Sequence, residues 1–181
     1  IASCLVGSEM CIRDRLTAGT RVGVHRYTFP AGKDAHVVLD LRSSLYNYPG
    51  KILWSSVRLR PNGTITGMRE TRGWAPARKL YFAIRPNAPL AGHVFHNREG
   101  KIAYTGFQAP GRGRADLAQL QGQALVAALD FGRLTRPLEL KVAISSVDED
   151  GAIANLDSEP GSFDAVAAAA PVSYTHLRAH E

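Results

Sequence analysis

Hydrophobic and polar positions alternate along most of the chain with a period of two residues. The clearest case is the segment 138–147, where Leu138, Leu140, Val142 and Ile144 alternate with polar or small residues. Because this period places successive side chains on opposite faces of a strand, the segment is predicted to be a β-strand. Similar patterns predict further strands over 21–29, 36–41, 52–59, 64–68, 79–85, 93–96, 102–107 and 125–131.

Turn signals separate these predicted strands. Pro61-Asn62-Gly63 predicts a hairpin between 52–59 and 64–68, because Pro presets φ and Asn-Gly tolerates positive φ. In 21–29 the apolar phase slips between Val24 and Tyr27, which predicts a bulge near His25. The segment 109–121 is polar and contains glycine, and it is predicted to be a loop with one helical turn at most.

The number and spacing of these strands favour an all-β fold, an antiparallel β-sandwich. No strand–helix–strand alternation is present, which argues against a parallel sheet. Residues 163–170 are rich in alanine and carry Asp164 at their start, so they are predicted to begin one helix near the C-terminus. The acidic run Asp148, Glu149, Asp150 follows a strand and is interpreted as a solvated turn.

The two ends of the chain encode each other on opposite DNA strands. Codons exist for residues 5–14 whose reverse complement translates as Val-Ser-Tyr-Thr-His-Leu-Arg-Ala-His-Glu, the sequence of 172–181. The same string matches a transposon-type sequencing adapter. We therefore predict that 1–15 and 171–181 are adapter-derived tails, that 16–162 is a partial β-sandwich domain, and that 163–170 starts a linker helix.

Excluding the tails changes what the composition implies. Both cysteines, Cys4 and Cys11, lie in them, so 16–170 has no disulfide, thiolate zinc site or cysteine nucleophile. The chain carries a net charge of +6, which on its own would suit a basic nucleic-acid-binding β domain. The arginines are scattered over strands and no such motif is present, so no nucleic-acid partner is expected. No apolar run reaches the roughly 20 residues of a membrane span.

No complete active site is visible in the sequence. His93 and His96 fall on opposite faces of a predicted strand, so no metal site is predicted there. No pair of carboxylates can be placed across a sugar as a glycosidase requires, and no catalytic residue is assigned.

The densest run of chemically interesting residues is 67–76, between two predicted strands. A Trp face stacks on a sugar ring and Arg bonds hydroxyl groups, so Trp74 and Arg69 are the candidate substrate-side residues. A Trp that plugs the edge of the sandwich core is the simpler interpretation of Trp74, and the pattern favours it.

Several segments resemble, in order, those of a known family. The segment 21–30 (RVGVHRYTFP) is similar to its GxHRYTFP strand, and 67–75 is similar to its GxRxSxGWA segment, with Thr71 in place of the usual Ser. The segment 80–85 follows as its VYFAI strand, and 142–147, 152–156 and 163–165 resemble the end of the same domain. The family is the bacterial family 92 glycoside hydrolases, mostly exo-acting α-mannosidases.

The resemblance implies an N-terminal sandwich of the galactose-mutarotase-like type that packs on an (α/α)6 catalytic domain. In such enzymes the catalytic domain supplies a calcium ion and the acid and base, with inversion at the anomeric carbon. This chain is then expected to be non-catalytic and inactive alone, to support the catalytic domain and to shape a site for mannose-containing glycans. No cofactor is expected within it, and the parent is expected to be periplasmic or extracellular. The alternative is a free-standing carbohydrate-binding β-sandwich module.

Overall fold

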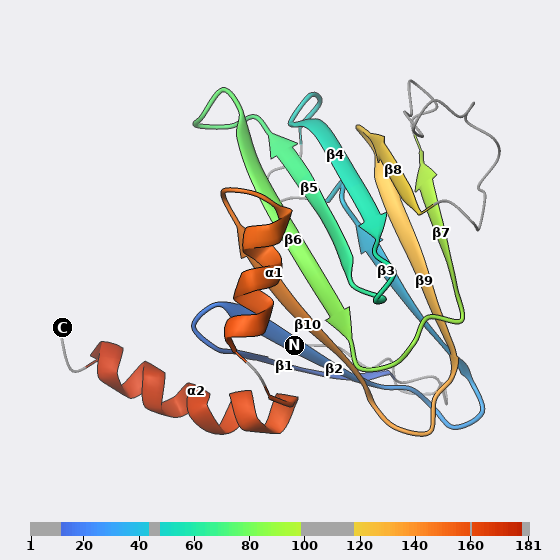
Figure 1. The fold of residues 1–181 in the computed structure, drawn as a ribbon, viewed down its shortest axis with the longest axis vertical. Coiled ribbons are helices and arrows are strands. Elements are labelled where there is room, and N and C mark those ends of the chain that lie inside the picture. Colours follow the sequence, from blue (N-terminus) through green and yellow to red (C-terminus); the bar gives the residue numbers. More distant parts are fainter. Residues whose placement is uncertain (1–11, 44–47, 99–117, 160, 179–181) are drawn as a thin grey trace.

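The protein is a β-sandwich with two helices on one outer face (Figure 1). The computed structural model describes residues 12–43, 48–98, 118–159 and 161–178. The strands are β1 (Arg13–Ala18), β2 (Val22–Thr28), β3 (Asp34–Asp40), β4 (Ile52–Leu59), β5 (Ile65–Thr71), β6 (Arg78–Pro86), β7 (Gly92–Asn97), β8 (Gln119–Gly122), β9 (Leu125–Arg133) and β10 (Leu138–Ser145). The helices are α1 (Glu149–Ser158) and α2 (Phe163–Arg178).

Two antiparallel sheets make up the sandwich. The larger has the strand order β1-β2-β10-β6-β5-β4-β8 and the smaller the order β3-β9-β7. The predicted fold class is therefore confirmed, and the predicted strands match observed ones closely wherever the structure describes them. The predicted strand 102–107 lies outside the described residues.

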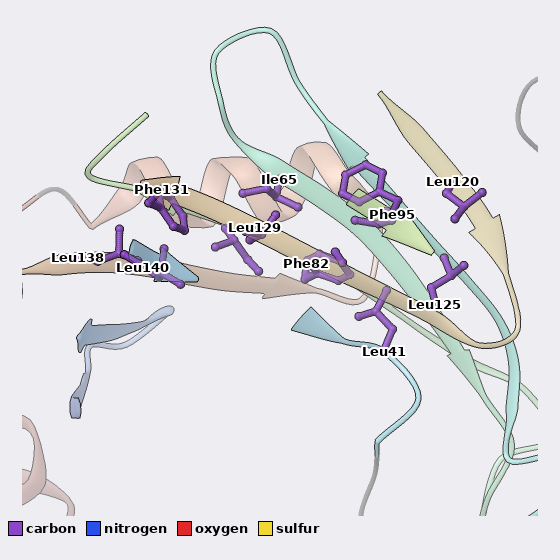
Figure 2. Close-up of a cluster of buried hydrophobic side chains, with 14 of the residues drawn as sticks. Leu41, Ile65, Phe82, Phe95, Leu120, Leu125, Leu129, Phe131, Leu138 and Leu140 are labelled. Carbon is purple, nitrogen blue, oxygen red and sulfur yellow. The ribbon is translucent and has the colours of Figure 1, made fainter. Parts of the chain in front are cut away.

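A sandwich core fills the space between the two sheets (Figure 2). Phe95, Leu125, Leu129 and Leu138 are each at most 1% exposed. Burying a side chain of this size contributes about 1.5–3 kcal/mol, so these four residues together contribute roughly 6–12 kcal/mol to the favourable free energy of folding. The pattern that predicted the strands is thus the pattern that builds this core.

A second core, the helix-side core, lies between the larger sheet and the helices. It consists of Val22, Val24, Ala83, Ala143, Ala152, Leu156, Phe163 and Val166. α1 lies over β10 and β6, and α2 lies beside β1 and β2 (Figure 1). The central strands β2, β6 and β10 are therefore covered on both faces.

Burial on both faces explains why the predicted bulge near His25 is wrong. The pairing of β2 with β1 and with β10 runs through His25 without a change of register. Val22 and Val24 face the helix-side core, whereas Tyr27 packs against the sandwich core. The slip of the apolar phase comes from a strand with two apolar faces and not from an inserted residue.

The predicted hairpin at Pro61-Asn62-Gly63 is confirmed. It joins β4 and β5, which are paired antiparallel. The Gly63 N–H donates to the Arg60 carbonyl at 2.9 Å, and φ of Gly63 is +78°. The side-chain oxygen of Asn62 accepts from the Thr64 N–H at 3.1 Å, as short polar side chains do in turns.

The acidic run 148–150 begins a helix, so the interpretation as a solvated turn is wrong. Asp148 is the N-cap of α1, and its side chain accepts a hydrogen bond from the Gly151 N–H at 2.6 Å. Glu149 accepts from the Thr66 hydroxyl at 2.6 Å and pairs with Arg60 at 3.3 Å. The first acids of the run thus fix the start of α1 and dock it on β5.

Two further predictions differ from the structure in their residue bounds. β8 overlaps the end of the predicted loop 109–121, which is wrong for 119–121 because Leu120 pairs with Val57 and enters the sandwich core. β1 begins at Arg13 and α2 extends to Arg178, so both overlap the stretches predicted to be adapter-derived. The origin of these stretches is a question about the DNA and stays a prediction.

Of the helices described, none is long and apolar enough to cross a membrane.

Candidate functional site

One end of the sandwich carries both residues selected from the sequence, Arg69 and Trp74. β5 ends there, β6 begins there, and the loop 72–77 joins them at the top of the view in Figure 1. The turn 48–51, which leads into β4, and the end of β3 lie at the same end. We call this region, made of residues 40–42, 48–55 and 69–78, the loop end.

Hydrogen bonds hold the loop 72–77 against the turn 48–51. The Arg72 N–H donates to the Lys51 carbonyl at 2.8 Å, and the Tyr48 hydroxyl donates to the Arg72 carbonyl at 2.7 Å. The Lys51 ammonium lies 5.5 Å from the centroid of the Tyr48 ring, within the range of a cation–π contact. Side chains of this loop are therefore presented from a backbone that is fixed on a rigid scaffold.

Trp74 projects from this loop into solvent. Its side chain is fully exposed, with a relative accessibility of 108%. The interpretation of Trp74 as a plug of the sandwich edge is therefore wrong. The physical reason is its position: β5 ends at Thr71, so Trp74 lies beyond the last residue whose side chain the sheet can direct into the core.

Arg69 points the other way, into the space between the sheets. It is in register with Ser55 of β4 and Leu80 of β6 on the face of β5 that also carries Ile65. Its Nε and Nη2 atoms are closed off from solvent, and among the described residues they meet no acceptor. Burial lowers the pKa of Arg69, and the Asp40 carboxylate acts in the opposite direction.

Asp40 at the end of β3 is already paired. Arg42 donates to its two oxygens from Nε at 3.0 Å and from Nη2 at 2.7 Å, and the Arg42 backbone N–H adds a third bond at 2.8 Å. These hydrogen bonds hold the pKa of Asp40 below its usual value. Asp40 is therefore an ionised carboxylate near Arg69 whose two oxygens already accept three hydrogen bonds from Arg42.

An open cavity of about 400 Å³ lies next to the fixed turn. Its lining comes from the end of β3, the turn 48–51 and the turn between β8 and β9. The residues are Arg42, Tyr48, Pro49, Gly50, Lys51, Ile52, Gln123 and Ala124. The volume lies in the range of small-molecule pockets, and the lining combines an aromatic ring with hydrogen-bonding groups.

The loop end does not assemble a hydrolytic centre from the residues that the structure describes. Glycoside hydrolysis needs two carboxylates, and the carboxylate beside Arg69 is engaged by Arg42. No group of three or more His, Cys, Asp or Glu in the described ranges is placed to hold a metal ion. His93 and His96 lie three residues apart on β7 and so on opposite faces, as predicted.

Comparison with known families identifies the domain. The model of the glycosyl hydrolase family 92 N-terminal domain matches residues 8–145, which is more than half of the chain. The chain belongs to glycosyl hydrolase family 92. Of the segments that carry the resemblance, 21–30, 67–75 and 80–85 lie within this match, and 142–147 overlaps its end.

Solved structures of family 92 enzymes share the fold. An alpha-mannosidase from Bacteroides thetaiotaomicron is 26% identical to this chain with a TM-score of 0.71, and the match covers 87% of this chain and 20% of the enzyme. In its complex with mannoimidazole the identity is 27% and the TM-score 0.69, and the match covers 84% of this chain and 19% of the enzyme. For a further family 92 hydrolase, ccman5, the identity is 25% and the TM-score 0.74, and the match covers 94% of this chain and 21% of the enzyme. A search of curated proteins finds no match. The chain spans about a fifth of the length of these enzymes.

Sequence reasoning found part of the family 92 loop end and missed the rest. It selected Trp74 and Arg69, which the structure places at the same end, with Trp74 in solvent and Arg69 on the face of β5 that points between the sheets. Tyr48 was not selected from the sequence. The contact between Tyr48 and Arg72 spans 24 residues, and the sequence carries no local signal for it.

Proposed function

We propose that this chain is the non-catalytic N-terminal sandwich of a calcium-dependent, inverting exo-α-mannosidase. The observation that carries the proposal is the family match over residues 8–145. It is supported by the solved relatives, which are named as alpha-mannosidases, one of them in complex with mannoimidazole. The calcium ion and the catalytic acid and base belong, in this proposal, to an (α/α)6 domain of the parent enzyme, which acts in the periplasm or outside the cell.

The loop end is the part of the sandwich that shapes the sugar site. Trp74 has the exposure that stacking on a sugar ring needs, and hydrogen bonds to the turn 48–51 fix its loop. The cavity lined by Tyr48 and Lys51 lies at the same end of the sandwich. Arg69 lies at the same end, and its Nε and Nη2 atoms are unpaired within the described residues.

Replacing Trp74 by alanine separates this role from a role in stability. In the isolated chain the free energy of unfolding should change by less than about 0.5 kcal/mol, because the exposed ring packs against nothing. In the parent enzyme, kcat/KM for an α-1,2-mannobiose should fall about 10- to 100-fold, since a lost stacking contact costs transition-state binding. Trp74→Phe, which keeps an aromatic face, should retain most activity. An unchanged kcat/KM in Trp74→Ala would remove Trp74 from the sugar site.

The isolated chain is expected to hydrolyse nothing. Incubation with an α-1,2-mannobiose and calcium should release no mannose above the buffer control, because the acid and base lie elsewhere in the proposed parent. Mannose release in proportion to the amount of chain would contradict the proposal. A free-standing carbohydrate-binding module also predicts inactivity, but it requires mannan binding by this chain alone, lost in Trp74→Ala. The proposed N-terminal domain requires an open reading frame that continues into the catalytic domain.

A further inference from the structure

Three polar atoms at the loop end lack hydrogen-bond partners and lie on neighbouring side chains. Arg69 and Ser55 face each other in register on adjacent strands. Arg69 contributes Nε and Nη2 and Ser55 contributes Oγ, and within the described part of the chain none of the three is paired. Removing a guanidinium from water without an acceptor is unfavourable, and an incoming acceptor recovers that loss.

Asp40 does not fill this role. It is the carboxylate whose charge acts on Arg69, but Arg42 already binds both of its oxygens. The Arg42 backbone N–H bonds the same carboxylate. Neither Nε nor Nη2 of Arg69 bonds Asp40 within the described residues, so an acceptor for these two atoms comes from a different group.

The unpaired edge of Arg69 has the geometry of a carboxylate site. Its Nε and Nη2 point two parallel N–H bonds in one direction, which matches the two oxygens of a carboxylate. The chain uses this edge once elsewhere in that way: Arg42 binds one oxygen of Asp40 through Nε at 3.0 Å and the other through Nη2 at 2.7 Å. Arg26 also binds a carboxylate through Nε and Nη2, at 2.9 Å and 2.7 Å, but both atoms donate to a single oxygen of Glu139. A sugar hydroxyl offers one oxygen and leaves the charge uncompensated.

The charge around Arg69 also favours an anionic partner. The loop end carries, besides Arg69, the basic residues Arg42, Lys51, Arg72 and Arg78, against the carboxylates of Asp40 and Glu70. We propose that Arg69 and Ser55 form a binding site for a carboxylate, supplied by an Asp or Glu side chain of another segment of the parent enzyme. The choice of occupant rests on the proposed function, whereas the chemistry of the site does not.

Acetate is a direct probe of this site. Thermal unfolding of the 181-residue chain is followed by circular dichroism at constant ionic strength while chloride is exchanged for acetate. We expect the Tm to rise by about 2–4 °C, because a ligand bound only by the folded state stabilises it. Acetamide has the shape of acetate without the charge, and it should not shift the Tm. Mannose should not shift it either.

Two variants connect the response to Arg69. Arg69→Met removes the partly buried cation and keeps an unbranched side chain, so it should raise the Tm without acetate by roughly 3–6 °C and abolish the response to acetate. Arg69→Lys keeps a charge without the two-pronged edge and should lose most of the response. If Arg69→Met does not fold, the comparison of the unmodified chain with Arg69→Lys tests the site.

Each of the remaining outcomes overturns the carboxylate site. These are no acetate shift, an equal shift in the unmodified chain and in Arg69→Met, or an equal response to acetamide. A shift with mannose in place of acetate would also remove the site while supporting a sugar contact, and so would leave the proposed function standing. Conversely, an acetate response together with unchanged activity in Trp74→Ala would keep the site and reject the sugar-side role of the loop.

Discussion

Replacing Gly67 by alanine is expected to destabilise the domain by about 3 kcal/mol or more, or to prevent folding. A Cβ atom at Gly67 would lie 2.1 Å from the carbonyl oxygen of Ser56 and 2.6 Å from Cζ of the Phe82 ring. The carbonyl belongs to the backbone of the neighbouring strand β4 and cannot move away without breaking the pairing of β4 with β5. Urea unfolding followed by circular dichroism measures the loss.

Gly73→Ala is the matched control, because it changes the second glycine of the same segment. A Cβ atom at Gly73 would meet nothing within 4 Å. The free energy of unfolding should therefore change by no more than about 0.5 kcal/mol. If the two alanine variants unfold at the same urea concentration, the close packing of Phe82 over Gly67 is not a feature of the folded protein.

The segment 67–75 has two structural roles: it packs closely in the core at one position and presents a side chain to solvent at another. Gly67 lets the Phe82 ring lie against β5 inside the sandwich core, whereas Trp74 is presented to solvent seven residues later. The sequence reveals the run as unusual but does not assign these roles. Which residue meets the core depends on where β5 ends, and strand ends are poorly determined by local pattern.

The strands were predictable because period-two burial is a local property of the chain. The side of each strand that is buried was less predictable, since it depends on what covers the sheet. β10 illustrates this: Leu138 and Leu140 enter the sandwich core as the pattern predicts, while Ala143 on the other face is 1% exposed beneath the helices. Ile144, on the predicted apolar face, is 52% exposed.

α1 was missed for a related reason. Only Ala152 and Leu156 of this helix are buried and Ile153 is partly buried, so its apolar face is narrow and the acidic run dominates the pattern. The usable signal was the capping position, because an Asp that accepts from an N–H three residues later is typical of a helix start. Several docking contacts of α1 are polar and long-range, such as Arg85 to Asp157 at 2.7 Å and Arg60 to Glu149 at 3.3 Å, and leave no periodicity in the sequence.

The helices lie beyond the residues that match the family model, yet they complete the domain. The match ends at Ser145, and α1 and α2 follow it. α2 is held at its first residue: the Phe163 N–H donates to Glu139 at 3.2 Å, and the Arg26 guanidinium lies 4.3 Å from the Phe163 ring centroid. Arg26 also bridges Glu139 and Asp164, at 2.7 Å to each. The Asp164 pKa is lowered by its hydrogen bond with Arg26.

Phe163→Ala should therefore reduce the free energy of unfolding by about 3–4 kcal/mol, because it empties a position that is 2% exposed and removes the ring beneath Arg26. Phe163→Leu keeps most of the buried volume and should lose only about 1 kcal/mol. Val147→Ala, at a position that is 74% exposed, should be nearly neutral. Urea unfolding of the three variants measures this order. If Phe163→Ala lost no more than Val147→Ala, α2 would not be docked on the sheet, and the helix-side core would end with α1.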